Sequence, residues 1–143
     1  MAALMQGRVL AAGSAQGELL YAAEPLSFWG GYDPASGEVI DRRHPLSGAI
    51  AAGRVLAIPA SRGSSTTAAV LLEAVRAGSA PAAILTAGVD TFLALAAIVA
   101  DELYGRALPV VALAPADFAR LAGGGRVHVT ADGRVAFDDA APA

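Results

Sequence analysis

Apolar runs alternate with helical patterns through the middle of the chain, and few folds accommodate that order. The apolar runs lie at 55–58, 82–85 and 109–113, and helical patterns lie between them at 66–77 and 91–103. Neighbouring parallel strands need a long crossover connection, which is usually a helix. The order therefore predicts a small parallel sheet with two crossover helices.

Both helical patterns carry signals for where each helix ends. Gly78 stands where a C-terminal cap glycine belongs, and Gly105 ends the second pattern. The second pattern is apolar nearly all round, so we expect that helix to be well buried. Residues 115–121 predict a short third helix with a proline near its start. The first pattern has the i, i+3, i+4, i+7 spacing of an amphipathic helix, at Ala68, Leu71, Leu72 and Val75.

Antiparallel strands are indicated on both sides of this alternating region. The tripeptide Gly-Arg-Val, a turn glycine followed by a strand, begins at residues 7, 53, 125 and 133. Residues 131–133 predict a tight hairpin. In all, the sequence predicts an α/β fold, a compact β/β/α domain with a mixed sheet or barrel and two to three helices. We expect one domain over residues 1–143, with an ordered core at about 7–137. The strands expected outside the alternating region lie at 8–12, 18–22, 38–41, 126–130 and 134–137.

Two missing residue types exclude several kinds of chemistry. All ten basic residues are arginine, so this chain supplies neither a Schiff-base lysine nor a P-loop lysine. It has no cysteine, which excludes an internal disulfide, a cysteine nucleophile and an iron–sulfur ligand. With two histidines, we expect no metal site. The net charge of −3 argues against nucleic-acid binding, which needs a basic face.

The chain shows no sign of a membrane segment. The longest apolar run, at 92–100, is shorter than the roughly 20 residues that span a bilayer. The first residues lack the basic and apolar regions of a signal peptide. We expect a soluble cytoplasmic protein.

A hydroxyl-rich stretch, Ser61-Arg62-Gly63-Ser64-Ser65-Thr66-Thr67, joins the first apolar run to the first helix. We call residues 61–67 the serine turn. One interpretation is a capped helix, which needs a single hydroxyl and gains about 1 kcal/mol. The other is an anion site, because free N–H groups and the helix dipole hold anions and stabilise a serine alkoxide. In the anion-site interpretation, Gly63 lets the backbone approach the anion closely, and Arg62 pairs with a carboxylate or phosphate. The residues alone leave both interpretations open.

Aromatic residues beside a double glycine form a second candidate, the loop Phe28-Trp29-Gly30-Gly31. It is either a hydrophobic plug over an open sheet end or a loop that lines a substrate site or docks a partner. Three other polar features predict no chemistry. His44-Pro45 indicates a turn, Arg42-Arg43 a solvated pair, and His128 a solvent-facing strand residue.

Three blocks together resemble the small subunit of the aconitase X family. They are PLSFWGGYDPASGEVIDRRHPLSG at 25–48, GRVLAIPASRGSSTTAAVLLEAVRAGSAPAAIL at 53–85, and AIVADELYGRALPVV at 97–111. The resemblance runs from about residue 7 to residue 137 with the blocks in order. It implies a swivelling domain of the aconitase type that closes over a larger subunit. That subunit carries an iron–sulfur cluster and most of the active site, in a heterodimer or higher assembly.

The resemblance also assigns roles at the serine turn. It implies that Ser64 is the acid or base of a dehydration, with Ser65 as the alternative, and that Arg62, Gly63, Ser65 and Thr66 bind the substrate. The loop at 28–31 would lie at the domain closure. Ordinary aconitases have Gly-Ser-Ser-Arg, whereas Thr66 stands at the arginine position here. We therefore do not expect the substrate to be bound in the way that ordinary aconitases bind citrate.

The family includes dehydratases of two small hydroxy acids, cis-3-hydroxy-L-proline and mevalonate 5-phosphate. A composition rich in alanine and arginine favours a bacterial source and hence the hydroxyproline activity. Two other functions stay open: a module that binds small anions without catalysis, and a purely structural lid. An isolated copy could cover its docking face by forming a homodimer.

Overall fold

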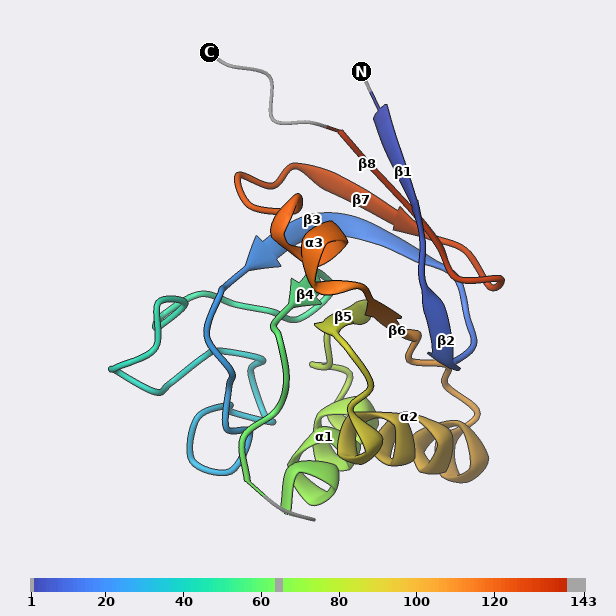
Figure 1. The fold of residues 1–143 in the computed structure, drawn as a ribbon. Coiled ribbons are helices and arrows are strands. Elements are labelled where there is room, and N and C mark those ends of the chain that lie inside the picture. Colours follow the sequence, from blue (N-terminus) through green and yellow to red (C-terminus); the bar gives the residue numbers. More distant parts are fainter. Residues whose placement is uncertain (1, 64–65, 139–143) are drawn as a thin grey trace.

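The computed structural model describes residues 2–63 and 66–138, and over that part of the chain it has eight strands and three helices (Figure 1). The strands are β1 (Ala2–Gln6), β2 (Arg8–Ala11), β3 (Ala15–Tyr21), β4 (Val55–Ala57), β5 (Ala83–Ala87), β6 (Val110–Leu113), β7 (Arg126–Val129) and β8 (Arg134–Asp138). The helices are α1 (Thr66–Ala77), α2 (Thr91–Tyr104) and α3 (Pro115–Ala119).

The predicted parallel sheet forms the centre of the fold. Strands β3, β4, β5 and β6 are parallel neighbours. Helix α1 connects β4 to β5, and α2 connects β5 to β6. The two helices pack against each other below the parallel strands (Figure 1). The alternation in the sequence is thus realised as two crossover units side by side.

The N-terminal segment nearly closes this sheet into a barrel. The strand order is β1-β8-β7-β3-β4-β5-β6-β2, so β1 and β2 lie at its two ends although only Gly7 separates them. The N–H of Gly7 donates to the Gly133 carbonyl at 2.8 Å. A Cβ at this position would lie 2.3 Å from Val111 Cγ1, so a side chain would not fit. The mixed sheet or barrel expected from the sequence is confirmed.

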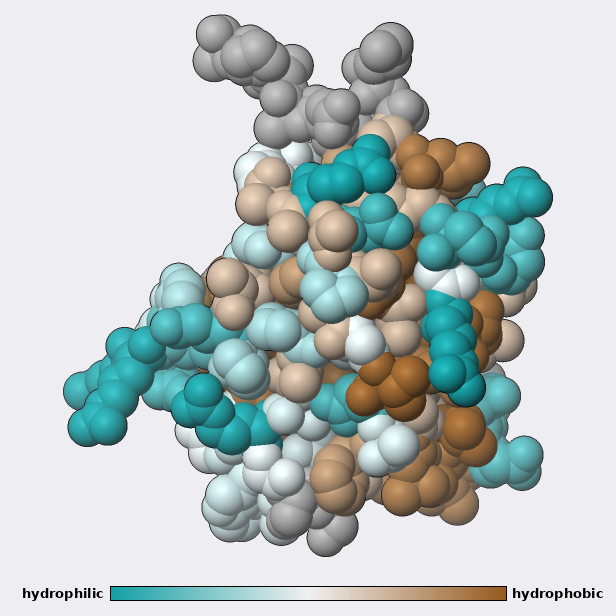
Figure 2. Space-filling view, viewed as in Figure 1, coloured by the Kyte–Doolittle hydropathy of each residue, from teal (hydrophilic) through white to brown (hydrophobic). Residues whose placement is uncertain are grey.

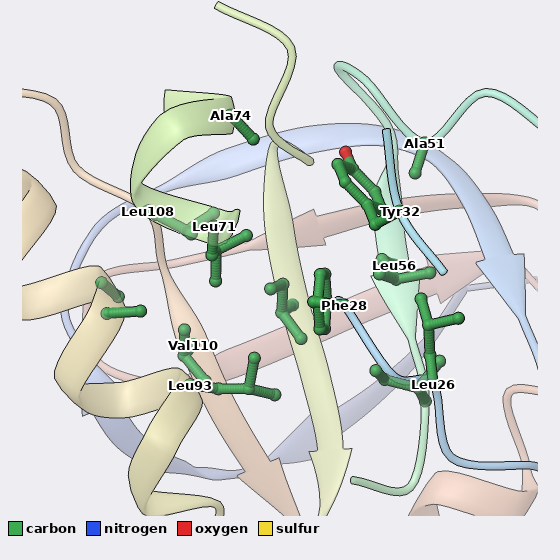
Figure 3. Packing of buried hydrophobic residues seen from close by; sticks show 14 of the residues in the cluster. Leu26, Phe28, Tyr32, Ala51, Leu56, Leu71, Ala74, Leu93, Leu108 and Val110 are labelled. Atoms are coloured by element: carbon green, nitrogen blue, oxygen red, sulfur yellow. The ribbon is translucent and has the colours of Figure 1, made fainter. Parts of the chain in front are cut away.

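Strands β4, β5 and β6 are buried on both faces and separate two hydrophobic clusters. Along β4, Val55 and Ala57 face the interior of the barrel, whereas Leu56 faces the helices. The barrel interior is completed by α3 and by the β7–β8 hairpin. Figure 3 shows the helix-side cluster, which includes Leu71 of α1, Leu93 of α2 and Leu56 of β4. Burial of both faces explains why these strands read as unbroken apolar runs.

Residues 22–54 form a long connection between β3 and β4, which we call the irregular segment. It contains no helix and no extended strand, only single bridges such as Tyr32 with Val39 and Glu38 with Ile50. The strand expected at 38–41 is therefore reduced to bridges. The segment is nonetheless well packed, because Leu26, Phe28, Tyr32, Val39 and Ala51 are almost fully buried.

Helix α2 is less buried than its composition suggested. One face, with Leu93, packs against α1 and strands β2 and β6. Nothing in the described part of the chain covers the other face, which shows as brown surface over α2 (Figure 2). We call this outer surface the α2 face. It consists of the exposed side chains of Phe92, Leu95, Ile98 and Leu103, the last of them 63% exposed.

The remaining differences from prediction are local. Strand β1 was not expected, and it exists because it pairs with β8 over its whole length. Helix α3 ends at Ala119 rather than at residue 121. The predicted bounds of α1 and the hairpin position are confirmed. No helix over 2–63 and 66–138 is long and apolar enough to cross a membrane.

Candidate active site at the serine turn

The serine turn leaves the carboxyl end of β4 and is tied to the next strand connection. β5 ends at Ala87, and Asp90 follows before α2 begins. Because neighbouring parallel strands end at the same edge of a sheet, Ser61 and Asp90 meet there. One carboxylate oxygen of Asp90 accepts hydrogen bonds from the Ser61 backbone N–H at 2.7 Å and from its hydroxyl at 2.8 Å.

The other carboxylate oxygen of Asp90 caps α2. It accepts a hydrogen bond from the Leu93 N–H at 3.0 Å, which satisfies one of the free donors at the helix start. Asp90 is buried. A single carboxylate therefore fixes the entrance of the serine turn to the start of α2, at the edge where ligands bind in open parallel sheets.

The irregular segment holds the same turn through backbone bonds. Leu26 pairs in parallel with Ser61. Its N–H donates to the Ala60 carbonyl at 3.2 Å, and its carbonyl accepts from the Arg62 N–H at 3.0 Å. Leu26 itself is fully buried. The backbone is thus fixed as far as Arg62.

The predicted site residues divide into two groups. Arg62 and Gly63 are exposed, and Thr66 is exposed as the first residue of α1. Gly63 has φ +115°, a backbone conformation that favours glycine. Ser64 and Ser65, to which the sequence assigns the acid–base role and substrate binding, lie outside the described residues.

A polar pocket of about 540 Å³ opens beside Arg62. Three segments meet at it, the start of the irregular segment, the turn at 41–44 and the serine turn. Two arginines, Arg43 and Arg62, and two acidic residues, Glu24 and Asp41, are among its lining residues. We call it the arginine pocket. Its lining residues are Glu24, Pro25, Asp41, Arg43, His44 and Arg62.

His44 is a structural part of this pocket. The side chain is buried, and its Nδ1 accepts a hydrogen bond from the Leu46 N–H at 3.1 Å. That bond assigns the ring proton to Nε2, which donates to the Glu24 carbonyl at 3.2 Å. Both ring nitrogens are therefore satisfied in the neutral form. The turn expected at His44-Pro45 is confirmed, and the ring ties it to residue 24.

Comparison with known proteins assigns the chain to a family. The model of the aconitase X swivel domain matches residues 4–137. The chain belongs to this family. A swivel domain is also what the fold indicates, since the crystal structure of Thermococcus kodakaraensis aconitase X in its holo-form superposes with a TM-score of 0.85. That match has 33% identity and covers 95% of this chain and 98% of the other.

Two curated relatives of the swivel domain differ in length and in name. A cis-3-hydroxy-L-proline dehydratase of Pseudomonas aeruginosa is 62% identical over 110 residues, which are 77% of this chain and 19% of that protein. This chain therefore spans about a fifth of that relative. A phosphomevalonate dehydratase small subunit of Thermococcus onnurineus is 38% identical over 128 residues, 90% of this chain and 92% of that one.

The aromatic loop of the swivel domain has one buried and one exposed ring. Phe28 lies in the helix-side cluster, with its ring centroid 5.3 Å from that of Tyr32 (Figure 3). Trp29 is 69% exposed. Gly30 has φ +75°, and a Cβ at Gly31 would lie 2.1 Å from the Ser27 carbonyl oxygen. The double glycine thus lets the chain turn sharply, with one ring buried and the next exposed.

The first turn of α1 holds an unused polar group. Thr67 is 1% exposed, and its hydroxyl has no hydrogen-bond partner in the described structure. A buried hydroxyl without a partner costs about 1–3 kcal/mol. Within the described residues, the last residue of the serine turn therefore retains an unsatisfied donor and acceptor.

Sequence reasoning missed several residues that surround the turn. Arg43 was interpreted as one of a solvated pair, and Asp90 was not singled out. The signal for Asp90 was available, because a polar residue after β5 must meet one after β4 if the two strands are parallel. No such signal was available for Arg43, because no local sequence pattern indicates that the turn at 41–44 lies beside Arg62.

Proposed function

We propose that this chain is the swivelling small component of an aconitase X-type dehydratase and presents the serine turn to a site completed by a larger chain. The observation that carries the proposal is the anchoring of the turn. A buried carboxylate on one connection and a buried strand-like contact on another fix the backbone up to Arg62. Such rigid support is what a reactive group needs in order to be held in position.

The reaction class is the loss of water from a small hydroxy acid. The relatives named above support it, since both are called dehydratases. We take cis-3-hydroxy-L-proline as the first substrate, because the relative of that name is the more similar of the two in sequence. The alternative substrate is mevalonate 5-phosphate.

Several residues of the serine turn have a defined task in this proposal. In the dehydration, a base removes a proton from the carbon next to the carboxylate, the carbon–oxygen bond at the neighbouring carbon breaks, and a double bond forms. The departing hydroxide takes a proton and leaves as water. Ser64 is the acid or base, and Ser65 is the alternative. Arg62 orients the carboxylate, while backbone N–H groups near Thr66 hold negative charge.

The partner is a larger, cysteine-containing chain or domain that holds an iron–sulfur cluster. The swivel domain offers such a cluster no ligands. Its sequence has no cysteine, and no group of three histidine or carboxylate residues over 2–63 and 66–138 could hold a metal ion. We therefore assign the cluster to the partner and no part of it to this chain.

The α2 face is the surface that we propose contacts this partner. Phe92 lies two residues after Asp90, which anchors the serine turn, so the uncovered apolar surface begins at the site itself. Contiguous apolar surface of this kind marks interaction sites. Ile98→Glu should weaken capture of the partner while the isolated chain stays folded. A stable homodimer of the isolated chain that is abolished by Ile98→Glu, with partner capture unaffected, would assign the face to a second copy instead.

The first test is purification of the tagged chain from its source cells. A larger, brown co-purifying protein that dehydrates cis-3-hydroxy-L-proline is the expected result. In that complex, Ser64→Ala should lower kcat by about 10²–10⁴-fold, as expected for loss of a general acid or base. Ser65→Ala is the matched comparison. If Ser65→Ala alone abolishes turnover, the acid–base role moves to Ser65, and if neither variant loses turnover, the serine turn is not catalytic.

The second candidate function is a non-catalytic anion-binding module, which the two arginines of the arginine pocket favour. It requires no partner. Tight binding of inorganic phosphate by the isolated chain, together with a partner-free purification, would support this candidate over the dehydratase.

A further inference from the structure

The arginine pocket is built from three segments that are locked together, so its charged side chains start from fixed positions. The His44 ring joins the turn at 41–44 to the carbonyl of residue 24. Both the N–H and the carbonyl of Leu26 form hydrogen bonds that join the irregular segment to the strand connection at 60–62. Within the turn, the Arg43 N–H donates to the Asp41 carboxylate at 3.0 Å. Glu24 and Arg62 therefore line the same pocket, although they are 38 positions apart in sequence.

Among the described residues, the charged side chains of this pocket form no ion pair. Over residues 2–63 and 66–138, ion pairs form between Glu73 and Arg76, between Asp117 and Arg120, and between Asp132 and Arg134, all away from the pocket. The guanidinium groups of Arg43 and Arg62 take part in none of these. The same holds for the carboxylates of Glu24 and Asp41. Four charged residues thus line one pocket, and none of them is in an ion pair with another described residue.

The balance of the two signs points to a particular ligand chemistry. Two cationic and two anionic side chains line the pocket, so a ligand with a single charge would meet a like charge whichever way it enters. A phosphate ester, with two negative charges, would gain the arginines but be repelled by both carboxylates. A zwitterion can satisfy both signs, because its carboxylate suits a guanidinium fork and its ammonium suits a carboxylate.

We propose that the arginine pocket binds the zwitterionic head of an amino acid and thereby selects amino-acid over phosphorylated hydroxy acids. Arg43 and Arg62 hold the carboxylate, and Glu24 and Asp41 receive the ammonium group. The inference rests on the proposed dehydratase function and names the substrate class at its site. Arg62 lies two positions before Ser64 in sequence, so a ligand held here sits beside the serine turn.

The test is direct binding to the isolated, isotope-labelled chain, followed by NMR. The probe is L-proline, a zwitterion that lacks the hydroxyl and so cannot be dehydrated. Pyrrolidine, cyclopentanecarboxylate and inorganic phosphate serve as the cation, the anion and the doubly charged anion. We expect L-proline to bind most tightly, with a dissociation constant in the millimolar range, and to shift the side-chain signals of Arg43 and Arg62.

Two exposed neighbours provide a matched pair of variants. Arg43→Ala should weaken L-proline binding about tenfold, as expected for loss of a charge-assisted hydrogen bond. Arg42→Ala removes the same charge one position away but does not touch the pocket, and it should leave the affinity within about twofold. Equal losses from both variants would show only a general effect of net charge and would overturn the proposal.

The carboxylates provide the converse test. Glu24→Gln and Asp41→Asn keep the size and one acceptor oxygen of each side chain. Together they should weaken L-proline and strengthen phosphate, so that the preference reverses. The proposal is overturned if phosphate binds the unmodified chain more tightly than L-proline, or if L-proline shifts no pocket signal up to about 100 mM. Because the probe is unreactive, this result is independent of turnover. Dehydration by the assembled complex without L-proline binding here would reject the pocket and keep the function.

Discussion

The irregular segment and the β7–β8 hairpin are both packed onto the sheet, but different interactions hold them. In the hairpin, Val127, Val129, Val135 and Phe137 point inward and alternate with exposed residues, and a regular ladder pairs the two strands. The irregular segment has no ladder. It buries Phe28 and Tyr32 in the helix-side cluster, and side-chain and backbone bonds join it to distant parts of the chain.

This difference shows what each region can do. A ladder spreads its support over many equivalent backbone bonds, and it holds the hairpin in the sheet between β1 and β3. The irregular segment depends on a few specific contacts, and in return it places polar residues at positions that no strand would give them. Binding residues are commonly found on such connections when a rigid scaffold holds them. The arginine pocket lies on this segment and not on the hairpin.

The largest expected effect concerns a buried ring in each region. Phe28→Ala and Phe137→Ala should each lower the free energy of unfolding by about 3–5 kcal/mol, because each leaves a cavity in a core cluster. Their effects on the arginine pocket should differ. Phe28 lies two residues from Leu26, which fixes the serine turn, so its loss should also abolish the L-proline shifts at Arg43. Urea unfolding and the NMR titration measure the two effects.

Phe137→Ala is the control for stability loss alone. It should leave L-proline binding within about twofold, because the hairpin shares no lining residue with the pocket. If both variants lose the pocket equally, the irregular segment has no special role in placing it.

A smaller effect is expected from one hydroxyl of the irregular segment. The Tyr32 hydroxyl donates to the Ser79 carbonyl at 2.8 Å in a buried position, and burial raises the pKa of this phenol, with the nearby Asp33 charge adding to the shift. Tyr32→Phe leaves that carbonyl without its partner and should cost about 1–2 kcal/mol. Tyr104→Phe, at a partly exposed helix end, should cost less than about 0.5 kcal/mol. Equal midpoints for the two variants in urea unfolding would mean that this bond does not hold the segment.

The same contrast explains what could be predicted from the sequence. The bounds of α1 and the position of the hairpin follow from spacing and from a turn glycine, which are local signals. The burial of Phe28 agrees with one of the two interpretations of its loop, the hydrophobic plug. The bond from Tyr32 to Ser79 could not be predicted, because it joins residues far apart in sequence. The serine turn was identified from its composition. Its surroundings were not, because Glu24, Arg43 and Arg62 meet only through tertiary contacts.

The smallest expected effect comes from one aspartate in a turn of each region. In the irregular segment, the Ala35 N–H and the Ser36 hydroxyl bind the Asp33 carboxylate and lower its pKa below the usual value. In the hairpin, the Thr130 hydroxyl does the same for the pKa of Asp132. A lowered pKa in the folded state means that each carboxylate stabilises the fold above the ordinary value of 3.8. That contribution is lost as the pH falls through the lower folded value.

The local consequences of acid should nevertheless differ between the regions. When Asp33 is protonated, the bonds that its carboxylate accepts from the Ala35 N–H and the Ser36 hydroxyl weaken, so the amide signals of Ala35 and Ser36 should shift strongly below pH 4. When Asp132 is protonated, the β7–β8 ladder remains, so the neighbouring amides should shift less. Asp33→Asn and Asp132→Asn should remove the respective transitions from an NMR pH titration. A larger acid shift in the hairpin would mean that its turn, and not its ladder, keeps the strands paired, and the contrast between the two regions would then fail.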